Sequence, residues 1–160
     1  MRFRPFPRIA LAQPQDAPAL ARLYSRAWGA LGSRLGEDLL EEQVPSADDV
    51  RAWLLGGFEV YRASFDGRLA GAVRCSFPTG ACLLDRLAVA PEWVRRGVGR
   101  ALAEHALSRA RRAGMTRVWA QLSPALREAN ALFTELGFRE LAKAPPGRWG
   151  EDLLLLELRL

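Results

Sequence analysis

Hydrophobic and polar positions in the middle of the chain follow a pattern that predicts three consecutive β-strands. Residues 58–65 and 68–77 flank the pair Asp66-Gly67, which is typical of a two-residue hairpin turn. Residues 81–89 follow as a third strand, and Pro91 ends it because proline has no N–H to donate to a sheet. The three strands predict an antiparallel meander.

Helical patterns precede this meander. Residues 13–28 follow a short apolar strand at 9–12, and Asp16 stands where it can cap the helix. Residues 46–55 predict a shorter helix that opens with a Ser-x-x-Asp capping box. Residues 36–43 also have a helical pattern.

After the meander, the chain continues with helices and strands in turn. Apolar residues recur at four-residue spacing from Val98 to Ala110 and predict an amphipathic helix over 97–113, which Gly114 ends. The remaining elements are a strand at 116–122, a helix at 124–136 that Gly137 ends, a strand that begins at 138 and a strand at 152–160. The succession predicts a mixed α/β domain around a central antiparallel meander.

The composition indicates one globular domain over residues 1–160. The chain is 49% hydrophobic and 26% charged, which is enough apolar material for a core that sustains itself. The longest apolar run, 153–156, is too short to span a membrane, and residues 1–10 lack the apolar core of a secretory signal. We therefore expect a cytoplasmic protein without a membrane partner.

The net charge and the cysteine content indicate which kinds of partner and metal the protein is expected to bind. The net charge of +5 comes almost entirely from arginine, with Lys143 as the only lysine, and such a surface attracts phosphate and carboxylate groups. The arginines are scattered and no motif that reads RNA or DNA accompanies them, so we expect no nucleic acid. Cys75 and Cys82 lie seven positions apart in a chain with one histidine, which predicts packed, reduced thiols and no metal site.

A glycine-rich turn opens the helix at 97–113. Gly97 and Gly99 fall in its first turn, where the N–H groups lack helical partners and carry partial positive charge. Small residues there let an anion approach the backbone, and Arg95, Arg96 and Arg100 add charge, so the turn suits a phosphate or pyrophosphate. The alternative is a tight strand-to-helix turn with solvated arginines.

Three segments resemble the GNAT superfamily of acyl-CoA-dependent N-acyltransferases. The run LLDRLAVAPEWVRRGVGRALAEHAL at 83–107 resembles the family's motif A, with a strand, a Q/R-x-x-G-x-G/A loop and a helix. ANALFTELGF at 129–138 is similar to the family's A-x-x-LY-x-x-LGF segment, and RIALAQPQDAPALARLY at 8–24 to its first strand and helix. The resemblance implies a central mixed, largely antiparallel sheet of about seven strands, flanked by about four helices.

The resemblance also implies acetyl-CoA as co-substrate and a place for it. Its pyrophosphate would lie on the amides of residues 95–100, and its pantetheine arm between the strands at 83–89 and 116–122, which splay apart in this family. The oxyanion donor would be the amide of Ala88 or Val89. Asp85, on the same strand, is the candidate for the catalytic side chain. The residues implied to bind the cofactor are Leu87, Ala88, Val89, Val94, Arg95, Arg96, Gly97, Val98, Gly99, Arg100, Asn130 and Phe133.

Some positions depart from the family pattern. With Gly97 and Gly99 on the last two motif positions, Val94 stands where Gln or Arg is expected, although a motif that starts at Arg96 fits as well. Phe133 replaces the tyrosine that protonates the departing CoA thiolate in many members, and Leu126 replaces an asparagine. Either the thiolate leaves with water or another group as acid, or the chain binds acyl-CoA without turnover.

Carboxylates near the acyl carbon are candidates for the base that deprotonates the acceptor amine. Asp85 is the first candidate, since aspartate is unusual inside a strand, and its alternative is an ion pair with Arg74 across the hairpin. Glu92 is expected to be solvated or to orient the arginine-rich loop.

Two further residue types could take part in proton transfer. His105, the only histidine, falls beside the apolar stripe of its helix, which favours a partly buried structural role. Tyr24 and Tyr61 could replace the missing acid if they face the cleft, although core packing is the default.

The leading hypothesis is an N-acetyltransferase that moves an acetyl group from acetyl-CoA to a primary amine by direct attack in a ternary complex. The alternative is a catalytically weak acyl-CoA-binding or regulatory module. The resemblance implies a small-molecule or peptide amine as acceptor, in a pocket near residues 28–42 and 143–150, and raises the possibility of a homodimer. Glu37, Asp38, Glu41 and Glu42 could attract the amine or form a solvated face.

Overall fold

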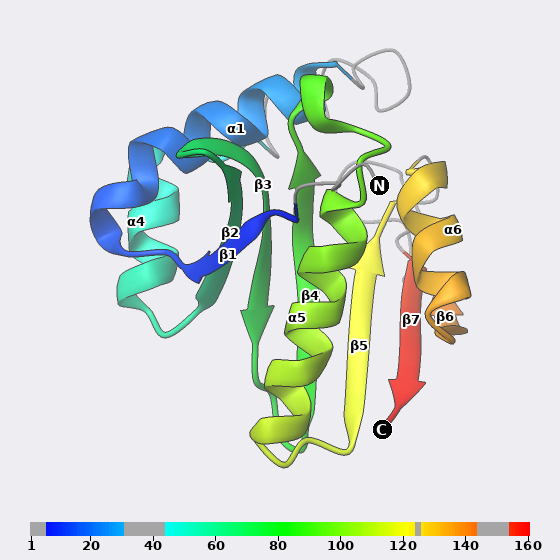
Figure 1. Cartoon of the computed structure of the whole chain (residues 1–160). Helices are drawn as coiled ribbons and strands as arrows, with labels where there is room; N and C mark the ends of the chain where they lie inside the picture. The colour runs from blue at the N-terminus through cyan, green and yellow to red at the C-terminus, as the bar shows by residue number, and fades with distance from the viewer. Residues whose placement is uncertain (1–5, 31–43, 124–125, 144–153) are drawn as a thin grey trace.

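A seven-stranded sheet with helices on both faces forms the framework of the protein in the computed structural model, which describes residues 6–30, 44–123, 126–143 and 154–160 (Figure 1). The strands are β1 (Arg8–Leu11), β2 (Glu59–Phe65), β3 (Arg68–Ser76), β4 (Ala81–Val89), β5 (Arg117–Leu122), β6 (Arg139–Lys143) and β7 (Leu154–Arg159). The helices are α1 (Ala17–Gly29), α4 (Ala47–Leu55), α5 (Val98–Arg112) and α6 (Arg127–Glu135), with single 3-10 turns η1 (Pro14–Asp16) and η2 (Pro91–Trp93). The predicted mixed α/β fold is confirmed.

The strands lie in the order β1-β2-β3-β4-β5-β7-β6, and β4 with β5 is the one parallel pair among these strands. The predicted meander corresponds to β2, β3 and β4, which are antiparallel neighbours. Pairing between β4 and β5 runs from Ala81↔Arg117 to Leu84↔Ala120 and then stops, although β4 continues to Val89. The last five residues of β4 therefore have no strand partner on their β5 side.

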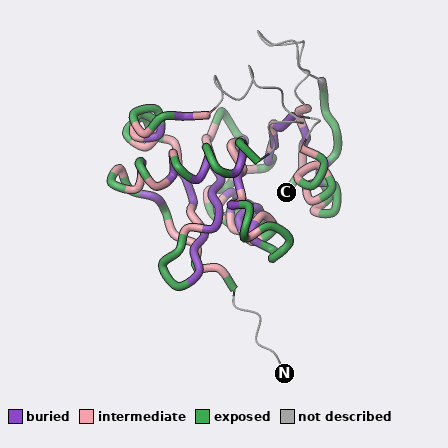
Figure 2. Tube along the Cα trace, turned by 90° about the horizontal axis from the view of Figure 1, so that it is seen from above, coloured by how far each residue is buried: buried purple, intermediate pink, exposed green. Residues whose placement is uncertain are grey.

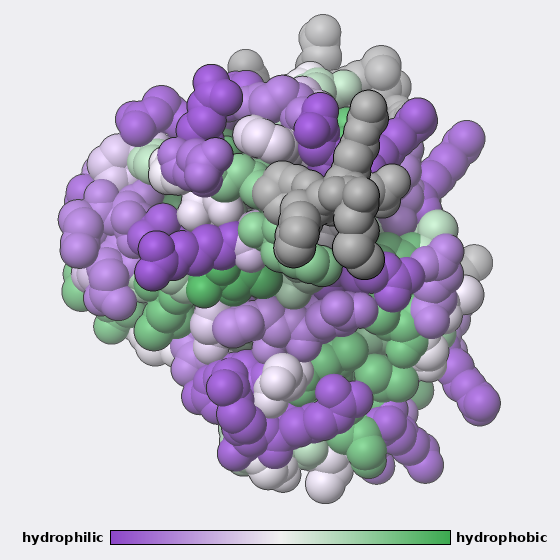
Figure 3. Space-filling model, in the orientation of Figure 1, coloured by the Kyte–Doolittle hydropathy of each residue, from purple (hydrophilic) through white to green (hydrophobic). Residues whose placement is uncertain are grey.

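Two apolar layers cover the two faces of the sheet. On one face, Leu20 and Tyr24 of α1 and Val50 of α4 are completely buried and pack with β2, β3 and β4. On the other, Leu102 of α5 and Phe133 of α6 join a larger cluster that includes β5 and β7. Figure 2 shows buried positions along the strands and the inner sides of the helices, and hydrophilic residues dominate the face in Figure 3.

The close approach of α5 to the sheet depends on Gly71 in β3. A Cβ atom at Gly71 would lie 2.8 Å from Cγ1 of Val98 and 2.9 Å from the carbonyl oxygen of Ala88. Real Cβ contacts are longer, so only glycine lets the start of α5 lie directly against this part of β3 and β4. Gly71 thereby fixes the helix N-terminus beside the end of β4.

Helix ends mostly follow their predicted signals. Gly114 ends α5 with φ +74°, and the Ser46–Asp49 capping box is present, with Asp49 N–H donating to Ser46 Oγ at 3.1 Å. The prediction for Asp16 was wrong in detail. Asp16 holds the N-cap position of α1, but its carboxylate accepts the Gln13 N–H at 2.7 Å, because η1 precedes the helix.

Other boundaries differ by one to four residues, the largest difference being at α1, which begins at Ala17 where the sequence predicted 13. Strand β1 ends at Leu11, one residue earlier than predicted, and α6 begins at Arg127 although the sequence predicted 124. Residues 152–153 of the predicted last strand, the predicted helix at 36–43 and the loop at 144–150 lie outside the described residues.

Candidate functional site

A bulge interrupts β4 at the point where it has left β5. Between Asp85 and Ala88, β4 has one residue more than the facing part of β3, and Arg86 takes a left-handed conformation with φ 53°. Such a conformation is rare for a residue with a side chain and is common at functional positions. The hydroxyl of Tyr24 in α1 donates to the Arg86 carbonyl at 2.9 Å and holds the bulge in place.

The bulge is followed by amides that alternate between the two edges of β4. Ala90 N–H donates to the Ala70 carbonyl at 2.8 Å, toward β3. Because amides alternate along an antiparallel ladder, Ala88 N–H also faces β3, whereas Val89 N–H faces the edge that β5 has left. Of the two residues that the resemblance implies as oxyanion donor, Val89 has the amide that faces the open side.

The turn after β4 presents a second group of amides. Arg95 and Gly97 have φ values of 62° and 79°, and Gly97 is the N-cap of α5. The first helical bond runs from Ala101 N–H to the Gly97 carbonyl at 3.0 Å. Among the described residues, the amides of 98–100 have no hydrogen-bond partner, so they are available to an anion at the positive end of the helix dipole.

The arginines of this turn differ in their contacts. The Arg96 guanidinium lies 5.4 Å from the ring centre of Trp93, and Arg95 is exposed. Arg100 instead forms ion pairs with Glu135 of α6 and with Glu104, the latter at 3.5 Å. Arg100 therefore ties α5 to α6, which the sequence did not predict.

Asp85 and Arg74 form a bidentate ion pair across β3 and β4. Arg74 Nε and Nη2 donate to the two carboxylate oxygens at 2.7 and 2.6 Å, and the side chains are only 13% and 16% exposed. The Arg74 guanidinium also lies 4.5 Å from the ring centre of Trp53 and 4.4 Å from that of Phe58. The ion pair predicted as the alternative for Asp85 is confirmed, and the role of base stays a prediction.

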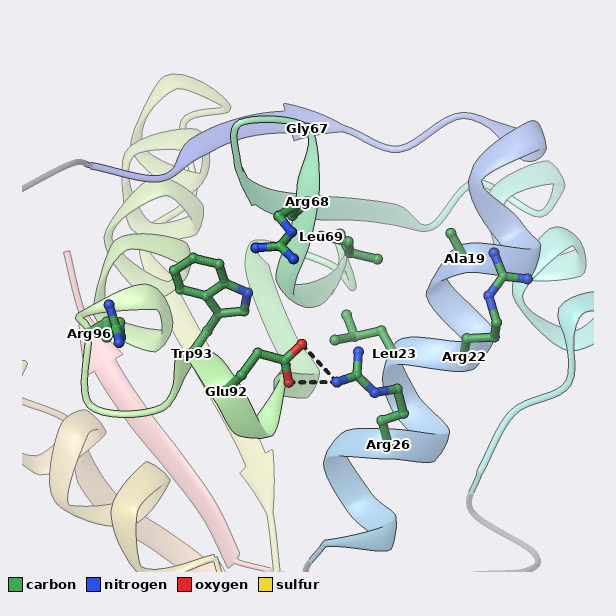
Figure 4. Close-up of a pocket in the computed structure, with 10 residues that line it drawn as sticks. All are labelled: Ala19, Arg22, Leu23, Arg26, Gly67, Arg68, Leu69, Glu92, Trp93 and Arg96. Carbon is green, nitrogen blue, oxygen red and sulfur yellow. Dashed lines mark hydrogen bonds and ion pairs between the residues drawn. The ribbon is translucent and has the colours of Figure 1, made fainter.

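Glu92 joins the start of the arginine-rich loop to α1. Its two carboxylate oxygens accept hydrogen bonds from Arg26 Nη2 at 2.7 and 2.6 Å (Figure 4). The Arg26 guanidinium lowers the pKa of the Glu92 carboxyl below its ordinary value. Glu92 is exposed and paired with α1, which agrees with the prediction that it is solvated or orients this loop.

The histidine and the tyrosines lie in packed environments. The ring of His105 lies 4.6 Å from that of Tyr61, and burial, with a smaller effect of Arg112, lowers the pKa of His105. Tyr61 donates to Glu59 at 2.6 Å. Tyr24 is fully buried, which raises the pKa of its hydroxyl. His105 is partly buried, as predicted, and its structural role stays a prediction. Both tyrosine protons are engaged in hydrogen bonds within the fold.

The residues of α6 that the resemblance singles out hold this helix against β5. Asn130 Nδ2 donates to the carbonyls of Ser123 and Leu126 at 3.3 and 3.0 Å. Phe133 is 3% exposed and packs edge-on against Phe138, with ring centres 5.0 Å apart. Neither contact involves the turn at 95–100, so their roles toward a cofactor stay predictions.

The geometry of the site depends on two residues that the sequence predictions did not single out. Gly71 allows α5 to approach the sheet, and Arg86 forms the bulge. A glycine inside a predicted strand is a signal for close backbone approach and could have pointed to Gly71. Nothing in the local sequence indicates the left-handed conformation of Arg86.

Several predicted features fall outside the described residues or concern the core. The acceptor region at 31–42, with its acidic cluster, and the loop at 144–150 are not described, whereas Trp28 packs against Tyr24 with ring centres 5.0 Å apart.

Cys75 and Cys82 are buried, unbridged thiols, as predicted. Within the described ranges, no group of three His, Cys, Asp or Glu side chains could hold a metal ion, and no helix has the length and apolar character of a membrane span.

A family model for the acetyltransferase (GNAT) family matches residues 17–138. The chain belongs to the GNAT acetyltransferase family. Over 80 residues, 50% of this chain, it is 29% identical to the alanine N-acetyltransferase of ribosomal protein bS18 from Escherichia coli strain K12, and the match spans about half of that protein, 54%. The corresponding enzyme of Salmonella typhimurium is 29% identical over 97 residues, 58% of this chain and 66% of that protein.

Solved structures share the fold of this GNAT protein at low sequence identity. The PaiA N-acetyltransferase of Thermoplasma acidophilum, in complex with coenzyme A, has a TM-score of 0.82 at 14% identity, over 96% of this chain and 99% of that one. The ribosomal-protein-alanine N-acetyltransferase of Brucella melitensis has a TM-score of 0.78 at 23% identity, over 96% and 99%. The sheet and helices described above are thus those of the family.

Proposed function

We propose that this protein transfers an acetyl group from acetyl-CoA to a primary amine, by direct attack of the amine within a ternary complex. The observation that carries the proposal is the open edge of β4, where the Val89 amide faces away from β3 beside the N-terminus of α5. One edge and one helix end together offer donors for both an acyl oxygen and a diphosphate.

The chain fits acetyl-CoA through its backbone rather than through side chains. Gly97 has φ +79° and no atom within 4 Å of the position of a Cβ, so an anionic group can approach the amides of 98–100. The amides of Leu87 and Val89 would hold the acyl arm along β4. When bound, acetyl-CoA supplies the activated acetyl thioester. The amides need no movement to meet the charge that develops on the carbonyl oxygen.

Proton transfer in the proposed reaction involves Asp85 and water. Both oxygens of Asp85 already accept hydrogen bonds from Arg74, and protonating this carboxylate would weaken two charge-assisted bonds. Asp85 remains our candidate base, with the acceptor proton passed through water. Since Phe133 has no proton to give, we propose that the thiolate leaves with water as acid, which the modest basicity of a thiol permits.

The acceptor is proposed to be a small-molecule or peptide amine. The relatives favour a peptide amine, because three of those reported above are alanine N-acetyltransferases of a ribosomal protein. The match covers only about half of the Escherichia coli relative, so the identity of the acceptor is a separate hypothesis from acetyl transfer itself.

Calorimetry with acetyl-CoA, followed by a CoA-release assay over amines, peptides and polyamines, tests the proposal. We expect binding of acetyl-CoA and CoA release with at least one primary amine. Binding without release on any acceptor would support the alternative, an acyl-CoA-binding module, which the buried Phe133 favours. Absence of binding would exclude both.

A further inference from the structure

A hollow with a volume of about 780 Å³ lies beside the turn at 95–100, on the side of α1 (Figure 4). Three elements line it: α1, the hairpin turn between β2 and β3, and η2 with the following loop. Each element contributes arginine: Arg22 and Arg26 come from α1, Arg68 from the hairpin and Arg96 from the loop. Among the described residues that line this hollow, Glu92 is the one carboxylate.

The charges around this hollow, which we call the arginine groove, do not balance. Glu92 already accepts two hydrogen bonds from Arg26. In the part of the chain that the structure describes, no ion pair joins Arg22, Arg68 or Arg96 to a carboxylate. Several guanidinium groups around one concave surface create a positive potential that attracts an anionic partner.

The aromatic wall of the groove indicates which kind of anion fits. The Trp93 ring stacks on Phe65, with ring centres 4.5 Å apart and an angle of 23°, and the Arg96 guanidinium lies over the same ring at 5.4 Å. Because Phe65 covers one face of the ring and Arg96 lies near it, the ring offers little surface for stacking a nucleic-acid base, which is how single strands are usually bound. Planar guanidinium groups on three separate elements suit several carboxylates along a chain.

We propose that the arginine groove binds an acidic peptide segment of a partner protein. Apolar contacts from Leu69, which is partly exposed and also lines the groove, would hold the backbone of such a segment between its charged side chains. The proposal concerns binding alone, so it stands or fails independently of acetyl transfer.

Fluorescence anisotropy with a short fluorescein-labelled poly-glutamate peptide tests this inference on the full chain. We expect saturable binding that weakens as salt rises, and little binding of a poly-glutamine peptide of the same length. Replacing both Arg22→Gln and Arg68→Gln should weaken binding by about tenfold, since each exposed charge pair contributes modestly. Neither residue belongs to the proposed acetyl-CoA site, so the affinity for acetyl-CoA should stay unchanged. This unchanged affinity would show that the double variant is folded.

A matched control separates the groove from the basic character of the whole protein. Arg111→Gln with Arg112→Gln removes the same charge from the exposed C-terminal end of α5. This control should change peptide affinity by less than about twofold, because its charges lie away from the groove. Equal weakening in both double variants would overturn the proposal. Preference for single-stranded nucleic acid over the acidic peptide would overturn it as well.

Discussion

Asp85 of β4 lies opposite Arg74 of β3, and both of its carboxylate oxygens accept hydrogen bonds from that guanidinium, at 2.7 and 2.6 Å. Trp53 and Phe58 lie against the same guanidinium. The pair stands directly before the bulge of β4, so it fixes the strand at the point where the open edge begins. The structural contribution of this pair and the proposed role of Asp85 as base can be tested separately by substitution.

Asp85→Asn should lower the free energy of unfolding by about 1–3 kcal/mol, because a mostly buried guanidinium loses its counter-charge. Asp48→Asn is the matched control, since the Arg51–Asp48 pair is exposed and should change stability by less than about 0.5 kcal/mol. If Asp85 is the base, the acetyl-transfer rate of Asp85→Asn also loses its pH dependence. An unchanged pH profile would assign the base elsewhere.

Gly97→Asp should weaken acetyl-CoA binding far more than Gly97→Asn. Both residues tolerate the left-handed conformation of Gly97 better than other side chains do, and both find open space at Cβ. They differ in charge, so the carboxylate repels a diphosphate that the amide does not. We expect at least about a tenfold difference in affinity by calorimetry, with similar thermal stability. Equal affinities would place the diphosphate elsewhere.

Gly71→Ala should destabilise the fold by about 1–3 kcal/mol, because the new Cβ would press on Val98 and on a backbone oxygen that cannot give way. Gly29→Ala serves as control, since a Cβ there meets nothing within 4 Å. Urea unfolding measures both. A Gly71→Ala protein as stable as the parent would show that α5 is free to shift on the sheet.

His105 should make stability depend on pH near neutrality. Burial lowers its pKa from 6.5, so the unfolded chain takes up a proton at a higher pH than the folded one. The contribution of His105 is fully present above the unfolded pKa and is lost as pH falls through the lower folded pKa. We expect the free energy of unfolding to fall from about pH 7.5 to about pH 5.5.

His105→Phe keeps an aromatic ring against Tyr61 and removes the titration. The pH dependence of unfolding should flatten in this variant, and acetyl transfer should persist if His105 is structural. Loss of turnover with an intact fold would instead make His105 a catalytic residue.

Local signals in the sequence predicted the elements that need only local chemistry. The Asp66-Gly67 turn, the Ser46–Asp49 capping box and the glycine that ends α5 all lie where expected. Each depends on the conformational freedom or hydrogen bonding of a few adjacent residues. The glycine-rich turn belongs to this group, which is why an anion site could be proposed before the fold was known.

The site itself depends on relations that no local pattern contains. Whether Asp85 meets Arg74, which edge the Val89 amide faces and where β4 parts from β5 all follow from strand register, and one added residue in the bulge changes them. The arginine groove combines three segments far apart in the chain. Spacing and turn chemistry are local, so the elements and the family resemblance could be predicted from the amino-acid order alone. Which amides and charges face one another could not, because these relations arise when distant strands pair.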